Sequence, residues 1–198
     1  MNVKSQLLNI GLSHFARDGY EGASLAKIAA EAGIKKPSIY AHFDSKADLF
    51  YKVLKRAARV QQHSIMRYIL EHRQDTLEQQ LHGLLHHILQ LYHTDDTIKF
   101  VVRMSFFPPQ ALEQQVFPLI YNMLDELERH LIKLFQYQLQ QEQDTLQLIV
   151  SVEQAARAYM TCADGIVIEV LYGQDQRSIQ RLDTIWPIYW RGIIDKSE

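Results

Sequence analysis

The amino-acid sequence predicts an all-α protein of about nine helices, and three features of the chain support this fold class. Hydrophobic residues make up 47% of the 198 residues and charged residues 22%, which is typical of compact globular domains. Gly and Pro are scarce, at 8 and 5 residues, so the chain lacks the turn residues that many short strands require. Long stretches rich in Leu, Gln, Glu, Ala and Lys have the apolar periodicity of helices.

The first expected helix is amphipathic and ends early. Leu8, Leu12 and Phe15 follow one another at i, i+4 and i+7, which places them on one helical face. The Asp18-Gly19 pair is a turn signal, so we expect the helix to break there.

Two short helices are expected next, on either side of a glycine. Ser24 is a favourable N-cap for a helix running to about Glu31, and Gly33 stands where a left-handed C-terminal cap is needed. The following helix is expected to begin at Pro37, because proline suits the first helical position, and to end near Phe43.

The remaining chain predicts longer helices without internal repeats. Ser45 and Asp48 form a capping-box pattern that opens one of them. Further helices are expected over residues 75–92, 94–107, 109–140 and 151–172, with Pro108-Pro109 separating two of them. A last helix should follow Gly173, and Pro187 is expected to kink or terminate it locally.

Charge and composition narrow the function classes. Residues 1–60 hold ten Lys or Arg and five Asp or Glu, whereas the rest is acidic, so a local polyanion-binding segment is one interpretation and ordinary charge fluctuation the other. One cysteine forbids an intrachain disulfide or a CxxC pair, no run of 18 apolar residues occurs, and the N-terminal stretch does not resemble a signal peptide. We therefore expect a cytoplasmic protein without a membrane partner.

Catalytic and cofactor signatures are missing from the sequence. It contains no G-x-S-x-G elbow, Walker loop or H-E-x-x-H helix. The sequence therefore predicts no catalytic residues, no cofactor and no enzymatic activity.

Residues 7–50 resemble a known DNA-binding domain. Two short helices around a glycine, the second beginning Lys-Lys-Pro-Ser, have the dimensions of a helix-turn-helix. This segment is similar to the N-terminal domain of the tetracycline-repressor-like (TetR) family of transcription regulators. The matching positions are Phe15, Gly19-Tyr20, Ser24, Ile28-Ala29, Ala32-Gly33, Tyr40, His42-Phe43, Ser45-Lys46 and Leu49. The resemblance implies a DNA-binding domain over residues 1–47 and a helical ligand-binding and dimerisation domain over 48–198.

The resemblance also implies which residues contact double-stranded DNA. They are Ser24, Lys35, Lys36, Pro37, Ser38, Tyr40, His42 and Lys46. Lys36 is the best candidate for reading guanine, although a lysine can equally bind phosphate. Tyr40 and Lys46 have alternative roles, as a core side chain and as an uncommitted surface charge. Ala26 departs from relatives that carry a longer base-contacting side chain there, so their operator sequences do not transfer.

A single module of this size makes few contacts, so we expect a homodimer that binds a palindromic operator with sites about 34 Å or a multiple of it apart. The resemblance implies that the last two helices form a four-helix bundle with their counterparts in the partner. The expected interface residues are Ala155, Cys162, Ile166, Ile179, Leu182, Trp186 and Tyr189.

The middle of the chain is rich in large apolar side chains, and in this family such helices bind effectors. The expected ligand-binding residues are Phe100, Arg103, Met104, Phe107, Phe117, Tyr121, Tyr159 and Glu169. They suit an apolar or aromatic small molecule. Core packing of the aromatics, and a buried ion pair or surface position for Arg103 and Glu169, are the alternatives.

Two further features do not predict a site. His82, His86 and His93 share one helical arc, but it lies on the polar flank, so solvated histidines are favoured over a metal site. Cys162 has apolar neighbours and is expected to be a buried, inert thiol.

The sequence thus predicts a ligand-responsive transcription regulator, a homodimeric repressor that an apolar or aromatic effector releases from its operator. A constitutive DNA-binding protein without an inducer and a helical small-molecule enzyme are the alternatives.

Overall fold

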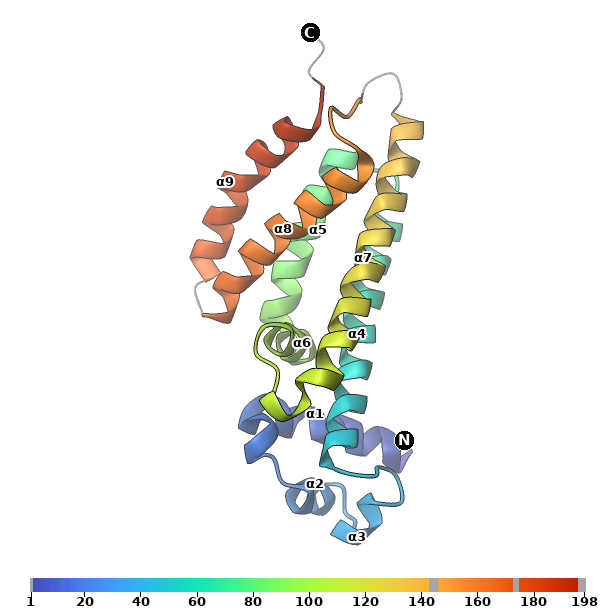
Figure 1. Ribbon diagram of the computed structural model, residues 1–198, viewed down its shortest axis with the longest axis vertical. Helices are drawn as coiled ribbons and strands as arrows, with labels where there is room; N and C mark the ends of the chain where they lie inside the picture. Colours follow the sequence, from blue (N-terminus) through green and yellow to red (C-terminus); the bar gives the residue numbers. More distant parts are fainter. Residues whose placement is uncertain (1, 143–145, 173–174, 196–198) are drawn as a thin grey trace. The chain divides into compact units, whose positions relative to one another are not determined.

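A computed structural model describes residues 2–142, 146–172 and 175–195, and over these residues it is entirely helical apart from turns and one isolated bridge between Leu148 and Ile194 (Figure 1). The predicted all-α fold with an N-terminal helix-turn-helix is therefore confirmed. The helices of the described residues are α1 (Val3–Gly22), α2 (Leu25–Glu31), α3 (Lys36–Ile39), α4 (Lys46–Glu71), α5 (Leu77–Thr94), α6 (Asp96–Phe106), the 3₁₀ helix η1 (Gln110–Leu112), α7 (Glu113–Gln141), α8 (Val152–Leu171) and α9 (Asp175–Ile193).

Helix α1 carries the predicted break inside its bounds. Gly19 has φ 71° and ψ 177°, a conformation that essentially only glycine adopts, so the chain changes direction there. The face that α1 buries consists of Leu7, Gly11, His14 and Phe15, one residue out of step with the predicted Leu8 and Leu12, which are half-buried.

The turn after α2 has the predicted left-handed glycine. Gly33 has φ 71°, its N–H donates to the carbonyl of Ala30 at 3.0 Å, and the Ile34 N–H donates to the carbonyl of Ala29 at 3.0 Å. This pair of bonds is a Schellman motif, which ends the helix and satisfies two of its last carbonyls. Ser24 occupies the N-cap position of α2, but its hydroxyl makes no capping hydrogen bond, contrary to the expectation.

Helix α3 is shorter than predicted. It begins at Lys36 with Pro37 in its first turn and ends at Ile39, whereas the sequence predicted an end near Phe43. The N–H groups of His42 and Phe43 both donate to the carbonyl of Ile39, so this stretch forms tight turns instead of another helical turn.

The capping pattern at the start of α4 differs from the prediction in one bond. The Asp48 N–H donates to the Ser45 hydroxyl at 3.0 Å, as expected for a cap. The Asp48 carboxylate accepts from the N–H of Asp44, not from that of Ser45, and from the Lys52 ammonium at 2.7 Å. Partial burial raises the pKa of Asp48, but the hydrogen bonds from Lys52 and the Asp44 backbone outweigh it and lower that pKa overall.

The later helices follow the predicted order with small shifts at their ends. Pro108-Pro109 separates α6 from α7 as expected, with η1 between them. Ser151 opens α8 in a complete capping box with Gln154. Helix α9 continues through Pro187 to Ile193, so the expectation of termination there is wrong. The break expected at Gly173 lies outside the described residues.

Contacts divide the chain into two compact units. The first combines residues 1–61 with 95–121, and the second combines 62–94 with 122–198. The predicted domain division after residue 47 stays a prediction, since these units follow packing and place the start of α4 and all of α6 beside the N-terminal helices.

The first unit is held together by an aromatic cluster. The Phe50 ring lies edge-on to Phe15 at 5.0 Å, to Tyr20 at 5.2 Å and to Phe100 at 5.8 Å between ring centroids. The three phenylalanines of this cluster, Phe15, Phe50 and Phe100, are at most 2% exposed. The cluster therefore joins α1, α4 and α6 in one apolar core.

The second unit has its own core. Residues from α4, α5, α7, α8 and α9 form it, among them Leu81, Phe135, Tyr159, Leu182 and Trp186. Within the described residues, no helix combines the length and apolarity needed to cross a bilayer.

The two left-handed glycines predict different costs of substitution. Ala at Gly19 meets no neighbouring atom within 4 Å, so its cost comes from the backbone conformation alone, and we expect a loss of about 1 to 3 kcal/mol in the free energy of unfolding. Asn at Gly33 should cost less, because Asn tolerates the left-handed region. Chemical denaturation of the two variants measures both values, and equal losses would contradict this account.

Candidate nucleic-acid interface

The helix-turn-helix of the first unit is formed by α2, the turn 32–35 and α3. Leu25, Ile28 and Ala29 bury one face of α2, while Ile39 and Phe43 are buried at 0% and 1% exposure. A helix of four residues has no stability of its own, so these two apolar side chains hold α3 in place.

The opposite side of α3 is open to solvent. Lys35, Lys36, Pro37 and Ser38 are all exposed and consecutive, so the structure brings these four predicted DNA-binding residues together at one edge. Two ammonium groups at this edge supply local positive charge, which phosphate neutralisation requires.

Tyr40 is 51% exposed, so core packing does not account for it. It follows α3 directly, next to the exposed edge. The candidates His42 and Ser24 are half-buried, and the His42 ring centre lies 6.5 Å from that of Phe43. Contact of these residues with DNA stays a prediction.

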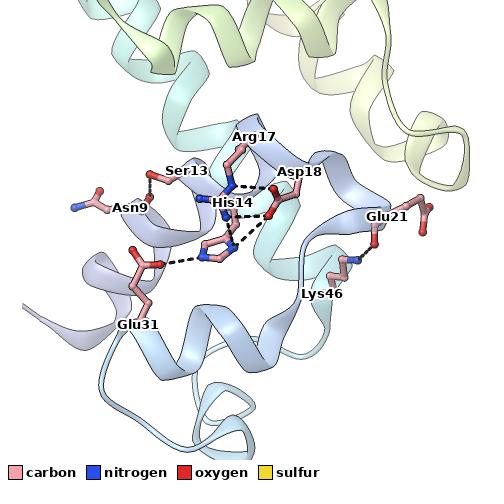
Figure 2. Close-up of polar contacts among 8 residues, drawn as sticks. All are labelled: Asn9, Ser13, His14, Arg17, Asp18, Glu21, Glu31 and Lys46. Atoms are coloured by element: carbon pink, nitrogen blue, oxygen red, sulfur yellow. Dashed lines mark hydrogen bonds and ion pairs between the residues drawn. The ribbon is translucent and has the colours of Figure 1, made fainter.

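Lys46 has partners inside the protein. Its ammonium donates to the backbone carbonyl of Glu21 at 3.0 Å (Figure 2). The same ammonium lies 4.7 Å from the centre of the Tyr20 ring. The first contact satisfies a carbonyl in the last turn of α1, where a cation is favourable. Lys46 therefore joins the start of α4 to the end of α1, a role that the sequence did not indicate.

A buried polar residue of α1 was also missed. His14 is 3% exposed, and its Nε2 lies 2.9 Å from a carboxylate oxygen of Glu31 in α2. The available signal was its position, since Leu7, Gly11 and His14 are spaced i, i+4 and i+7 on the face that α1 buries.

Comparison with protein families identifies this region. The model of the N-terminal domain of bacterial regulatory proteins of the tetR family matches residues 7–53, which include the whole helix-turn-helix and the start of α4. Residues 7–53 therefore match the DNA-binding domain of the TetR family.

The similar proteins that the comparison finds are named as transcription regulators. The negative transcriptional regulator IcaR of the biofilm operon icaADBC from Staphylococcus epidermidis is 24% identical over 135 residues, which cover 67% of this chain and 69% of IcaR. The IcaR of Staphylococcus aureus strain Newman is 36% identical over 53 residues, which span 27% of this chain and 28% of that protein. These relatives are regulators and not enzymes, in agreement with the prediction from the sequence.

Solved structures of transcriptional regulators share the fold along nearly the whole chain. A regulator from Mesorhizobium loti has a TM-score of 0.74 at 16% identity and covers 98% of this chain and 97% of its own. FadR from Bacillus subtilis in complex with stearoyl-CoA has a TM-score of 0.72 at 17% identity, with 96% and 98% covered. A regulator from Saccharomonospora viridis in complex with choline has a TM-score of 0.72 at 19% identity, with 98% of both chains covered.

The predicted ligand-binding residues of the first unit divide into buried and exposed groups. Phe100 and Met104 are buried in the core of that unit. Arg103 is exposed, as are the three aromatic residues Phe107, Phe117 and Tyr121. The rings of Phe117 and Tyr121, both on α7, stack on each other with centres 6.2 Å apart.

The predicted ligand-binding residues of the second unit have partners within that unit. The Tyr159 hydroxyl donates to the carbonyl of Leu81 at 2.8 Å, and burial raises the pKa of Tyr159 well above its ordinary value. The Glu169 carboxylate is 7% exposed and forms ion pairs with Arg177, at 3.3 Å, and with Arg181. The alternative of a buried ion pair therefore describes Glu169 as the structure has it.

Most of the predicted dimer residues pack inside the second unit. Ala155, Ile166, Leu182, Trp186 and Tyr189 are at most 7% exposed and belong to its core. Packing in this core accounts for their apolar periodicity, whether or not their helices also contact a partner.

Two predicted dimer residues remain accessible, Ile179 at 48% exposure and the half-buried Cys162. Cys162 lines a groove of about 560 Å³ between α8 and α9, together with Thr161, Gly165, Ile166, Arg177, Gln180, Arg181, Thr184 and Ile185. Burial raises the pKa of the Cys162 thiol, which disfavours the reactive thiolate.

The histidines of α5 have aromatic neighbours. The His82 ring stacks on Trp186 at 4.9 Å and meets His86 edge-on at 4.7 Å, so His82 is partly buried and not fully solvated as expected. This burial lowers the pKa of His82, and the neighbouring His86 adds to the effect. No group of three or more His, Cys, Asp or Glu side chains suited to a metal ion occurs in the part of the chain that the structure describes.

The internal contacts of Lys46 predict a measurable contribution to stability. Lys46→Met keeps the apolar stem but removes the bond to Glu21 and the contact with Tyr20, so we expect a loss of about 1 kcal/mol in the free energy of unfolding. Lys55→Met, on an exposed position of the same helix, should change it by less than about 0.5 kcal/mol. Urea denaturation compares the two, and an equal effect would refute the bracing role of Lys46.

Proposed function

We propose that this protein is a homodimeric, sequence-specific DNA-binding regulator of the TetR family that represses transcription and is released from its operator by a small-molecule effector. The observation that carries the DNA-binding part is the exposed edge Lys35–Ser38 on a short helix held by Ile39 and Phe43. A cationic edge on a rigidly packed helix is the feature that a helix-turn-helix inserts into the major groove.

Within this edge, Lys36 is proposed to read a base and its neighbours to position the helix. A lysine ammonium suits the O6 and N7 acceptors of guanine. Tyr40 and Lys35, both exposed, are proposed to bind the phosphate backbone, which fixes register without carrying sequence information. Lys46 and His42 keep their proposed phosphate contacts, although part of the Lys46 ammonium is already bonded to Glu21.

Repression is supported by the relatives. The IcaR proteins, which are similar to this chain, are named negative transcriptional regulators. A repressor of this kind blocks transcription by occupying its operator, so its activity requires DNA affinity and no catalytic group.

Dimerisation is proposed through the exposed face of α8 and α9. The groove that Cys162 lines and the exposed Ile179 lie on these two helices. Burial of the exposed apolar area of Ile179 against a second copy stabilises the dimer, and a two-fold axis then presents two α3 helices to one operator.

The effector is proposed to be apolar or aromatic and to act through α6 and α7. Related folds occur in complex with stearoyl-CoA and with choline. The proposed contacts are the exposed side chains Arg103, Phe107, Phe117 and Tyr121, with Phe100, Met104, Tyr159 and Glu169 as further candidates once their present contacts loosen. An effector that favours a DNA-incompetent state by about 1 to 3 kcal/mol lowers operator affinity about 5- to 150-fold.

Constitutive DNA binding without an effector is the second candidate. The packing of Phe100, Met104 and Tyr159 favours it, because these side chains are at most 6% exposed in the apolar cores of their own units. Thermal-shift screening separates the two candidates, since a ligand that binds only the folded protein raises its melting temperature.

The DNA-binding proposal predicts different effects for two substitutions. Against a duplex that the wild-type protein selects from a random library, Lys36→Ala should cost about 1 to 3 kcal/mol and reduce the preference over a scrambled duplex. Tyr40→Ala should weaken binding to both duplexes by the same factor. Fluorescence anisotropy at about 50 and 200 mM salt measures these affinities. Equal affinity of the wild-type protein for both duplexes would overturn the proposal.

The dimer proposal predicts that Ile179→Asp weakens self-association. A charge buried in the interface should raise the dimer dissociation constant about tenfold or more, which analytical ultracentrifugation detects. Ile149→Asp is the matched control, because Ile149 is also an exposed isoleucine of the second unit but lies outside α8 and α9. A dimer unchanged by Ile179→Asp would exclude this face.

A further inference from the structure

In the first unit, four polar side chains form a hydrogen-bonded network that connects α1 with α2. His14 lies at its centre, on the buried face of α1, with Glu31 on one side of the imidazole and Arg17 and Asp18 on the other (Figure 2). His14 is 3% exposed, whereas the Glu31 side chain is 56% exposed. The network therefore connects the buried His14 of α1 to the exposed Glu31 of α2.

The partners of the two imidazole nitrogens of His14 indicate which nitrogen carries the hydrogen. Nε2 lies 2.9 Å from a Glu31 carboxylate oxygen, which can only accept, so Nε2 donates. Nδ1 lies 3.3 Å from Nη2 of Arg17, which can only donate, so Nδ1 accepts. A hydrogen on Nε2 thus serves Glu31 while Nδ1 faces Arg17, and an Asp18 carboxylate oxygen lies 3.6 Å from Nδ1.

Arg17 is itself held by its neighbour. Its Nε and Nη2 donate to the two carboxylate oxygens of Asp18 at 2.8 and 3.0 Å, a bidentate arrangement. Hydrogen bonding to Arg17 lowers the pKa of Asp18, which keeps this carboxylate ionised. Four side chains thus form one continuous sequence, Asp18 to Arg17 to His14 to Glu31.

The last side chain of this hydrogen-bonded group, Glu31, stands just before the turn that leads to α3. Glu31 is the last residue of α2, and the Schellman turn at Gly33 leads from it to Lys35. The apolar contacts of Ile28 and Ala29 press α2 against the core, but such contacts are non-directional and tolerate small rotations. A hydrogen bond has a preferred length and angle, so the His14–Glu31 bond restricts those rotations at the end of α2 that leads to α3.

We propose that His14 is a positioning residue for DNA contact: through its Nε2–H bond to Glu31 it fixes the end of α2 and thereby the orientation of the exposed edge Lys35–Ser38. The inference rests on the proposed DNA-binding function and adds a specificity determinant that touches no DNA. Loss of the bond leaves the apolar core intact and lets α3 sample orientations that fit phosphate but not bases.

Two pairs of substitutions separate positioning from charge and packing. Glu31→Ala and Glu31→Gln both remove one negative charge, but Gln keeps an acceptor for the His14 N–H. His14→Leu and His14→Gln both fill the buried site, but only Gln places an N–H near the former Nε2. In each pair the Gln variant is the rescue, and the exposed Glu31 pair carries little risk of unfolding the protein.

Two readouts apply to the full-length chain: amide NMR shifts of residues 33–43 in the free protein, and affinity for the wild-type-selected duplex relative to a scrambled duplex. We expect Glu31→Ala and His14→Leu to shift these amides and to lower the preference for the selected duplex about fivefold, the factor that one hydrogen bond contributes. Both Gln variants should stay within about twofold of the wild-type protein.

Equal behaviour of Glu31→Ala and Glu31→Gln in a wild-type background that selects DNA would overturn this inference and leave the proposed function standing. A wild-type protein without any sequence preference would overturn the proposed function, and the DNA role of His14 with it. Altered amide shifts with unchanged duplex preference would also refute the role in specificity, because the link would then be structural alone.

Discussion

The four residues of α3 cannot form a stable helix in water, because nucleating a helix costs more than one turn of hydrogen bonds returns. Their geometry therefore depends on tertiary packing, chiefly on the burial of Ile39 and Phe43. The proposed DNA-reading edge is the other side of this same short segment. Whatever holds those two apolar side chains also orients Lys35 and Lys36, so the core of the first unit and its proposed function cannot be separated.

That core extends beyond the helix-turn-helix. Phe50 of α4 contacts Phe15 of α1 and Phe100 of α6, so α6, which the sequence assigned to the effector region, shares an apolar cluster with the DNA-binding helices. The proposed effector contacts on α6 therefore belong to the same compact unit as α3. In addition, α4 runs without interruption from Lys46 to Glu71 and contributes residues to both compact units. In the proposed function, an effector that moves α6 changes the apolar core that the DNA-binding helices share.

Local signals were predictable from the sequence where one residue type has one physical role. Gly33 adopts the left-handed conformation that its position suggested, and Ser151 forms the N-terminal cap of α8. The apolar periodicity predicted the order of the helices that the described residues form. It did not predict which helical face is buried within the chain, so Leu182 and Trp186 were assigned to a partner although they pack in the core of their own unit.

Features that depend on tertiary contacts could not be predicted in this way. The early end of α3 follows from turns that bring Phe43 into the core, and no local pattern encodes it. The bonds of Lys46 to Glu21 and of His14 to Glu31 join residues 25 and 17 positions apart, so periodicity within one helix says nothing about them. Pro187 failed as a helix terminator because a proline can be accommodated in a helix that tertiary packing stabilises.

Amide hydrogen exchange of the full-length protein, with and without a duplex selected from a random library, tests most directly that a packed α3 is the DNA-binding element. The account predicts that residues 39–43 are already protected in the free protein and that residues 35–42 gain protection when the duplex binds. Protection of another segment, with 35–42 unchanged by DNA, would contradict it.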